Sequence, residues 1–139
     1  MPDSPVQSLS SGSETKVTPA STLRVLVVED TEDAARLVAA YLKKWGHDSW
    51  VCTSGNEALA VAPNYKPDVI LIDIGLPDMT GWELVRRLPR GPLLIAITGR
   101  SEEDDFDRSH DFGIRYHLVK PAFQSQLRGL LERFAQGRA

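Results

Sequence analysis

Carboxylate, hydroxyl and amino side chains follow four short apolar runs of this 139-residue sequence. Glu29 and Asp30 come directly after the first run, and Asp73 comes directly after Val-Ile-Leu-Ile. Thr98 and Lys120 stand at the ends of two later runs. If the runs are parallel strands, their carboxyl ends meet at one edge of a sheet. The five side chains would then converge, although up to 91 residues (120 − 29) separate them in the chain.

Three carboxylates in one cleft favour a divalent cation. At a separation of about 4 Å, two carboxylates repel each other by roughly 4 kcal/mol at an effective dielectric constant near 20. A few hard oxygen ligands suit Mg²⁺, which keeps several waters and leaves room for a phosphate, whereas zinc prefers clustered His and Cys. Lys120 can cancel charge on a second anion, and Thr98 can hydrogen-bond to it. Such a set of groups can hold an acyl phosphate.

Each of these features also has a structural interpretation when it is taken alone. Glu29, Asp30 and Thr98 could be helix caps, and Lys120 with the proline after it could be a turn. Asp73 fits such an interpretation less well, because the end of a buried strand rarely tolerates an unpaired charge. The presence of all these groups in strand order favours a functional site.

Apolar runs alternate with amphipathic stretches from Leu23 onward. This alternation predicts an α/β fold with a doubly wound, five-stranded parallel sheet and helices on both faces. Ser54 and Glu57 predict a capping box for the second helix, and Pro63 is expected to end that helix after Ala62. The predicted strands are 23–28, 49–52, 69–72, 93–97 and 117–119, and the predicted helices are 31–45, 54–62, 82–88, 101–111 and 123–134.

Composition sets the domain boundaries and excludes several classes of partner. Residues 1–22 are rich in Ser, Thr and Pro and predict a disordered tail, which leaves 23–136 as one domain. The net charge of −3, from 16 basic and 19 acidic residues, does not suggest a basic surface for nucleic acid or for a membrane. No apolar run approaches the roughly 20 residues of a transmembrane helix. With no secretory signal and one cysteine, Cys52, we expect a cytoplasmic protein.

Residues 23–134 resemble the receiver domain of two-component response regulators. The resemblance rests on VLVVED (25–30), VILIDIGLPDMTGWEL (69–84), IAITG (95–99) and HLVKP (117–121). It implies a flavodoxin-like strand order 2-1-3-4-5 and a phosphorylatable switch rather than a turnover enzyme. The implied partners are a histidine kinase or phosphotransfer protein and a downstream protein, and a homodimer through the fourth and fifth helices is common in similar proteins. The N-terminal Met favours a free-standing protein over the receiver of a hybrid kinase.

The resemblance also implies a role for each residue that matches the family's motifs. Asp73 would accept the phosphoryl group. Mg²⁺ would be bound by Asp30, by Asp73, by the carbonyl of Gly75 and, mostly through water, by Glu29.

Further residues would contact the phosphoryl group. The backbone N–H groups of Gly75 and Gly99 would donate to its oxygens, Thr98 would be the switch hydroxyl, and Lys120 would pair with its charge.

Two other functions compete with the one that this resemblance implies. His117 stands where the family usually has Tyr or Phe, which puts the coupling to Thr98 in doubt and keeps a phosphorylation-independent pseudo-receiver as the alternative. Phosphatases of the haloacid dehalogenase type use similar groups, but they carry a second Asp where this chain has Gly75, and they place the acidic pair last in the chain. Poor turnover is therefore expected.

Overall fold

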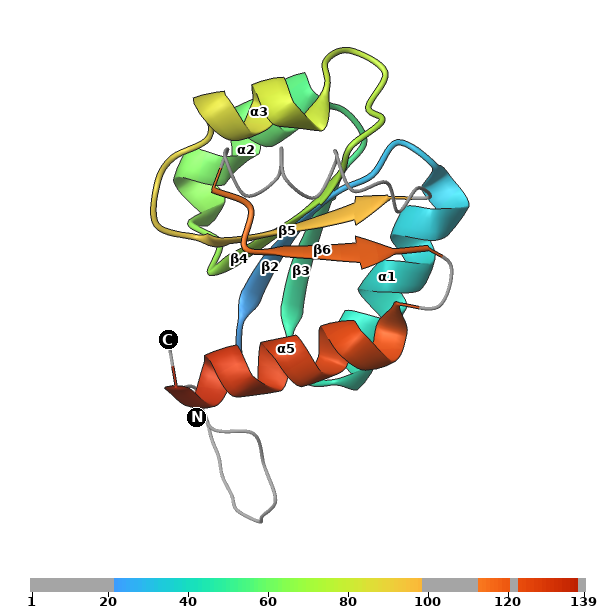
Figure 1. Ribbon diagram of the computed structural model, residues 1–139, viewed down its shortest axis with the longest axis vertical. Helices are drawn as coiled ribbons and strands as arrows, with labels where there is room; N and C mark the ends of the chain where they lie inside the picture. Colours follow the sequence, from blue (N-terminus) through green and yellow to red (C-terminus); the bar gives the residue numbers. More distant parts are fainter. Residues whose placement is uncertain (1–21, 99–112, 121–122, 138–139) are drawn as a thin grey trace, which may run out of the picture.

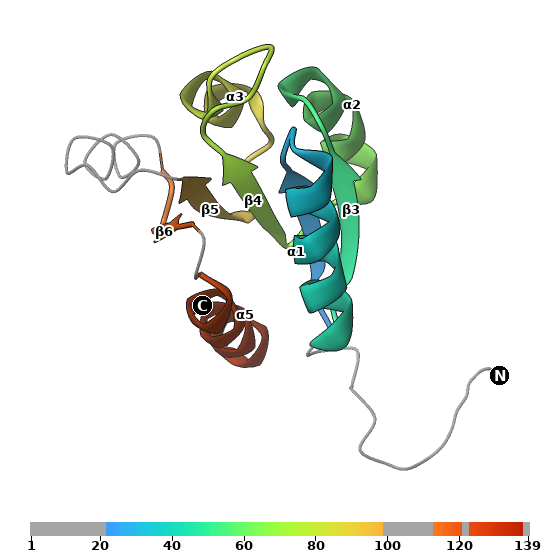
Figure 2. The ribbon, with the colours of Figure 1, turned by 90° about the vertical axis from the view of Figure 1, so that its right-hand side faces the viewer.

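In the computed structural model, the described residues fold into a five-stranded parallel sheet with helices on both faces (Figures 1 and 2). The structure describes residues 22–98, 113–120 and 123–137. The strands are β2 (Arg24–Val28), β3 (Asp48–Cys52), β4 (Val69–Asp73), β5 (Leu93–Thr98) and β6 (Tyr116–Val119). Their order across the sheet is β3-β2-β4-β5-β6. Counted along the chain from one to five, the strands have the order 2-1-3-4-5. The predicted doubly wound α/β fold is therefore confirmed.

The helices of the described residues lie on both faces of the sheet (Figure 1). Helices α1 (Glu32–Lys44) and α5 (Gln124–Gly137) pack on one face, and α2 (Gly55–Tyr65) and α3 (Gly81–Arg87) pack on the other. The strand residues alternate between two apolar clusters, because successive side chains of a strand point to opposite faces. Val27 and Leu71 face α1 and α5, whereas Leu26 and Ile70 face α2 and α3.

Strand β4 lies at the centre of the sheet between β2 and β5. Its first four residues, the Val-Ile-Leu-Ile run, are each at most 1 % exposed. This explains why the run is continuously apolar, since a central parallel strand is buried on both faces. Burying each such side chain contributes about 1.5–3 kcal/mol. The rigid central strand then holds Asp73 at its carboxyl end.

The prediction that Pro63 ends the second helix is wrong, because α2 continues to Tyr65. Tyr65 is 6 % exposed, packs in the α2–α3 cluster, and donates its hydroxyl to Asp48 Oδ2 at 2.7 Å. This packing outweighs the hydrogen bond that Pro63 cannot donate. Lys66 then ends the helix in the left-handed conformation, with φ 54°.

The predicted cap at Ser54 is present, with its hydroxyl accepting from Glu57 N at 3.1 Å. The Glu57 carboxylate accepts from the backbone N–H of Thr53 at 2.9 Å, one residue earlier than in a standard capping box. The predicted helix 101–111 and the predicted tail up to residue 21 lie outside the described residues. None of the helices that the structure describes is both long and apolar enough to cross a bilayer.

Candidate functional site

Parallel register brings the ends of four strands to one edge of the sheet. Val28 of β2 pairs with Ile72 of β4, and Ile72 in turn pairs with Ala96 of β5. At the next strand the backbone N–H of Lys120 donates to Thr98 O at 2.7 Å. The polar residues that follow these four strands therefore all lie at the same edge of the sheet.

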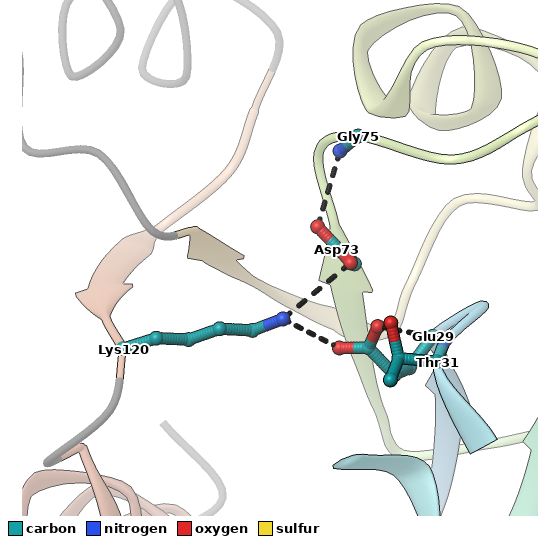
Figure 3. A network of polar contacts seen from close by, with 5 residues as sticks. All are labelled: Glu29, Thr31, Asp73, Gly75 and Lys120. Atoms are coloured by element: carbon teal, nitrogen blue, oxygen red, sulfur yellow. Dashed lines mark hydrogen bonds and ion pairs between the residues drawn. The ribbon is translucent and has the colours of Figure 1, made fainter. Parts of the chain in front are cut away.

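Lys120 lies between two of the carboxylates (Figure 3). Its Nζ is 2.9 Å from Glu29 Oε1 and 3.5 Å from Asp73 Oδ2. The other oxygen of Glu29 accepts from the backbone N–H of Thr31 at 3.2 Å. The other oxygen of Asp73 accepts from the backbone N–H of Gly75 at 3.1 Å. Both carboxylates are therefore held at each end, one end by the ammonium group and the other by the backbone.

The pKa of Glu29 is shifted by its surroundings in the site. This residue is 5 % exposed, and burial is the main reason that its pKa lies above the ordinary value. The hydrogen bond and the charge interaction with Asp73 raise the pKa of Glu29 further, against the lowering effect of Lys120. Burial by itself lowers the pKa of Lys120, but its hydrogen bond to Glu29 and the charges of Asp73 and Glu29 together raise this pKa above its usual value. The site therefore holds excess negative charge.

Three carboxylates can converge on a metal ion. Oxygens of Glu29, Asp30 and Asp73 lie within 4.8 Å of one another. Asp30 is exposed and Asp73 is partly exposed, so water can complete a coordination sphere. The cluster contains hard oxygen donors and no His or Cys, which fits Mg²⁺ and not zinc.

A mainly apolar cavity lies beside these groups. It has a volume of about 150 Å³ and is lined by Glu29, Asp73 and Lys120, by Gln124, and by apolar side chains of α1, of the central strands and of Phe123. At Gly75, an added Cβ would meet no atom within 4 Å. The Asp73 carboxylate is therefore accessible next to a positive charge.

The remaining predicted residues stand as follows. Thr98 ends β5, is 7 % exposed, and pairs in register with Val119, the residue before Lys120. Gly99 lies outside the described residues, as does the proline after Lys120. His117 lies in β6, half-buried and paired in register with Ala96.

Asp78 is a residue of the site region that sequence reasoning missed. Its carboxylate accepts from Gly55 N at 2.9 Å and from Asn56 N at 2.8 Å. These two bonds at the N-terminus of α2 hold the pKa of Asp78 below its usual value. They fasten the loop that carries Gly75 to a neighbouring helix. The sequence around Asp78 predicts a turn-rich loop, but it does not reveal the contact with Gly55, which lies 23 residues away in the chain.

Comparisons with known proteins agree with this geometry. Residues 25–132 match the family model described as the response regulator receiver domain. The chain is 31% identical over 110 residues to the protein PilH of Pseudomonas aeruginosa, an alignment covering 75% of this chain and 90% of that one. It is 31% identical over 109 residues to the cell cycle response regulator CtrA of Brucella ovis, covering 76% of this chain but 47% of that protein. The chain thus spans about half the length of that relative.

Solved structures give the same result. The chemotaxis response regulator CheY4 of Vibrio cholerae superposes with a TM-score of 0.74 at 27% identity, covering 81% of this chain and 98% of that one. This chain belongs to the response regulator receiver domain family of two-component signalling. Response regulators interact with histidine kinases and with downstream partners.

Proposed function

We propose that this receiver is a phosphorylatable switch that accepts a phosphoryl group on Asp73. The observation that carries the proposal is the position of the Asp73 carboxylate, between the N–H of Gly75 at 3.1 Å and the ammonium of Lys120 at 3.5 Å. One carboxylate oxygen of Asp73 attacks phosphorus, the bond from phosphorus to the donor breaks, and an acyl phosphate forms. When the donor is a phosphohistidine, the leaving imidazole nitrogen takes up a proton.

The residues around Asp73 supply binding and orientation. Lys120 would shift from Glu29 toward the phosphoryl oxygens, because these add negative charge beside its ammonium. The N–H groups of Gly75 and Gly99 would donate to the same oxygens, and the Thr98 hydroxyl would report the change. Glu29, Asp30, Asp73 and the carbonyl of Gly75 would hold Mg²⁺, which neutralises charge on the phosphoryl oxygens.

The phosphoryl donor in this proposal is a histidine kinase or a phosphotransfer protein, and the output is altered affinity for another protein. The domain in this proposal is the predicted unit of residues 23–136, and the tail predicted before it lies, up to residue 21, outside the described residues. A homodimer would use α5 and the fourth predicted helix, which lies outside the described residues. Hydrolysis of the acyl phosphate would be slow, because Gly75 provides no general base for the attacking water. The protein would therefore act as a signal carrier and not as a turnover enzyme. The protein would work in the cytoplasm, where its phosphodonors are.

The alternative, a pseudo-receiver that binds partners without phosphorylation, is less favoured. It draws on His117, which departs from the family's aromatic residue. Against it, Glu29, Asp73 and Lys120 form the contacts that a phosphoacceptor site needs.

The test is phosphorylation of the full chain by acetyl phosphate with Mg²⁺, followed by intact-protein mass spectrometry. The expected product gains one phosphoryl group, roughly 80 Da, and the gain disappears with EDTA. Asp73→Asn should gain nothing, whereas Asp33→Asn, which changes an exposed carboxylate of α1, should be labelled like the wild type. Labelling of Asp73→Asn would refute the assignment. A wild type and an Asp33→Asn variant that both stay unlabelled, despite measured Mg²⁺ binding, would favour the pseudo-receiver.

A further inference from the structure

A hollowed surface lies at the end of the sheet opposite Asp73. Its centre is the loop of residues 88–92 between α3 and β5, which Figure 1 shows at the left, away from the arrowheads of the strands. One hollow of about 460 Å³ lies between this loop and the end of α2, and another of about 590 Å³ lies between the loop and α3. A third hollow, of about 190 Å³, lies between β6 and α5 and shares Phe134 with the first. We call these three hollows and their rim the basic end surface.

Positive charge surrounds the hollows. The rim carries five cationic side chains and one acidic side chain among the described residues that line it. The acidic residue is Asp68, whose carboxylate already accepts from the backbone N–H of Arg24 at 2.9 Å. The whole chain has a net charge of −3, so the local excess is opposite in sign to the total. The cationic residues are Lys66, Arg86, Arg90, Arg115 and Arg133.

Ion pairs among the described residues do not account for three of these five cations. Elsewhere on the protein, exposed arginines pair with a glutamate one helical turn away, as Arg36 does with Glu32 and Arg128 does with Glu132. Within the part of the chain that the structure describes, Lys66, Arg90 and Arg133 take part in no ion pair. The described part of the chain therefore leaves these three charges for a partner.

Apolar side chains line much of the first and third hollows, and prolines stiffen the first. Four prolines line the first hollow, and the half-buried Phe134 lines it too. Proline fixes its own backbone, so less conformational freedom is lost when a ligand binds against it. The hollows can therefore take apolar side chains while the rim binds carboxylates. The prolines are Pro63, Pro67, Pro89 and Pro92.

We propose that the basic end surface binds an acidic polypeptide segment of a partner protein, with Leu-like side chains in the hollows and Asp or Glu on the rim. Charge complementarity supports this occupant, since Lys66, Arg90 and Arg133 stand exposed around hollows that apolar side chains partly line. A nucleic acid would place its phosphates, not apolar groups, against the prolines. The surface lies away from Asp73, so it can hold a partner in either phosphorylation state.

The test uses the full chain and a fluorescein-labelled peptide of alternating Glu and Leu, with fluorescence anisotropy as the readout. The peptide should bind, and binding should weaken from low to physiological salt. Arg90→Gln/Arg133→Gln should weaken binding about tenfold or more. The matched control Arg36→Gln/Arg128→Gln removes the same charge from other surfaces and should weaken binding less than about twofold. Asp73→Asn should bind the peptide as the wild type does.

Several results would overturn the proposal. One is equal binding of a peptide in which Gln replaces every Glu, and another is equal weakening by the two double variants. A single-stranded DNA oligonucleotide that binds as tightly, and loses affinity in Arg90→Gln/Arg133→Gln, would assign the surface to nucleic acid instead. Self-association in sedimentation velocity that the same variant abolishes would assign it to a second copy of this chain.

Discussion

Replacing Lys120 by Met removes the ammonium group that lies between Glu29 and Asp73. At an effective dielectric constant near 20, the attractions at 2.9 and 3.5 Å amount to about 6 and about 5 kcal/mol. Most of this is offset by the cost of removing the three charges from water. Losing one partner of a fully buried pair costs about 3–5 kcal/mol. Because the Lys120 side chain is 30% exposed, we expect a loss of about 2 kcal/mol in the free energy of unfolding.

The assay is urea unfolding at neutral pH with EDTA present, followed by circular dichroism. With a slope of about 1.5 kcal/mol per molar urea, the expected loss lowers the midpoint by roughly 1.3 M. Lys43→Met, at an exposed position in the last turn of α1, should change stability by less than about 0.5 kcal/mol.

A second variant separates the ion pair from other effects of the substitution. Lys120→Met/Glu29→Gln should recover most of the loss, because it leaves no uncompensated buried charge at Glu29. If Lys120→Met were as stable as Lys43→Met, or if Glu29→Gln rescued nothing, the contacts between Lys120 and Glu29 would not stabilise the folded protein.

Three further predictions concern single side chains. Because burial, and then Asp73, raises the pKa of Glu29, the folded state binds that proton more tightly than the unfolded state; without metal, the free energy of unfolding should fall as pH rises above 4.5, and Glu29→Gln should reduce that fall in urea titrations at several pH values. Gly81→Ala should cost about 1–3 kcal/mol in thermal unfolding, because its Cβ would lie 3.0 Å from the Ile74 backbone, whereas the Cβ of Gly55→Ala would lie 2.6 Å from the side chain of Met79, which can shift, so that this variant should cost less. Burial, and then a nearby glutamate, raises the pKa of the fully buried Cys52 thiol to about 12, so an aryl disulfide should label it rapidly in urea and very slowly in the native protein; equal rates would contradict its burial.

The edge of the sheet that carries the site could be predicted from the sequence because its signals are local. The Val-Ile-Leu-Ile run before Asp73 predicts a buried strand, and a parallel sheet brings the ends of such strands together. The convergence of Glu29, Asp30, Asp73 and Lys120 follows from that topology alone. Which carboxylate Lys120 pairs with does not follow from the topology. Lys120 lies closer to Glu29 than to Asp73, and this preference depends on strand register and side-chain rotamers.

The end of α2 could not be predicted because a distant contact outweighs a local rule. Pro63 is a strong local signal for the end of a helix, but Tyr65 gains its burial and its hydrogen bond from β3. The role of Asp78 has the same kind of cause, since its partners at Gly55 and Asn56 belong to another element. In both cases the deciding interaction joins residues that the sequence does not show to be neighbours.

The order of the groups along the chain has a consequence for folding during synthesis. A ribosome releases Glu29, Asp30 and Asp73 well before Lys120, which enters the site from the last strand. Strands β2 and β4 pair directly, so the early docking of their ends gathers carboxylates before the ammonium group exists to balance them. We expect the nascent sheet to stay loosely packed at this edge until β6 emerges and pairs with β5. Free divalent cations in the cell would relieve the repulsion during that interval.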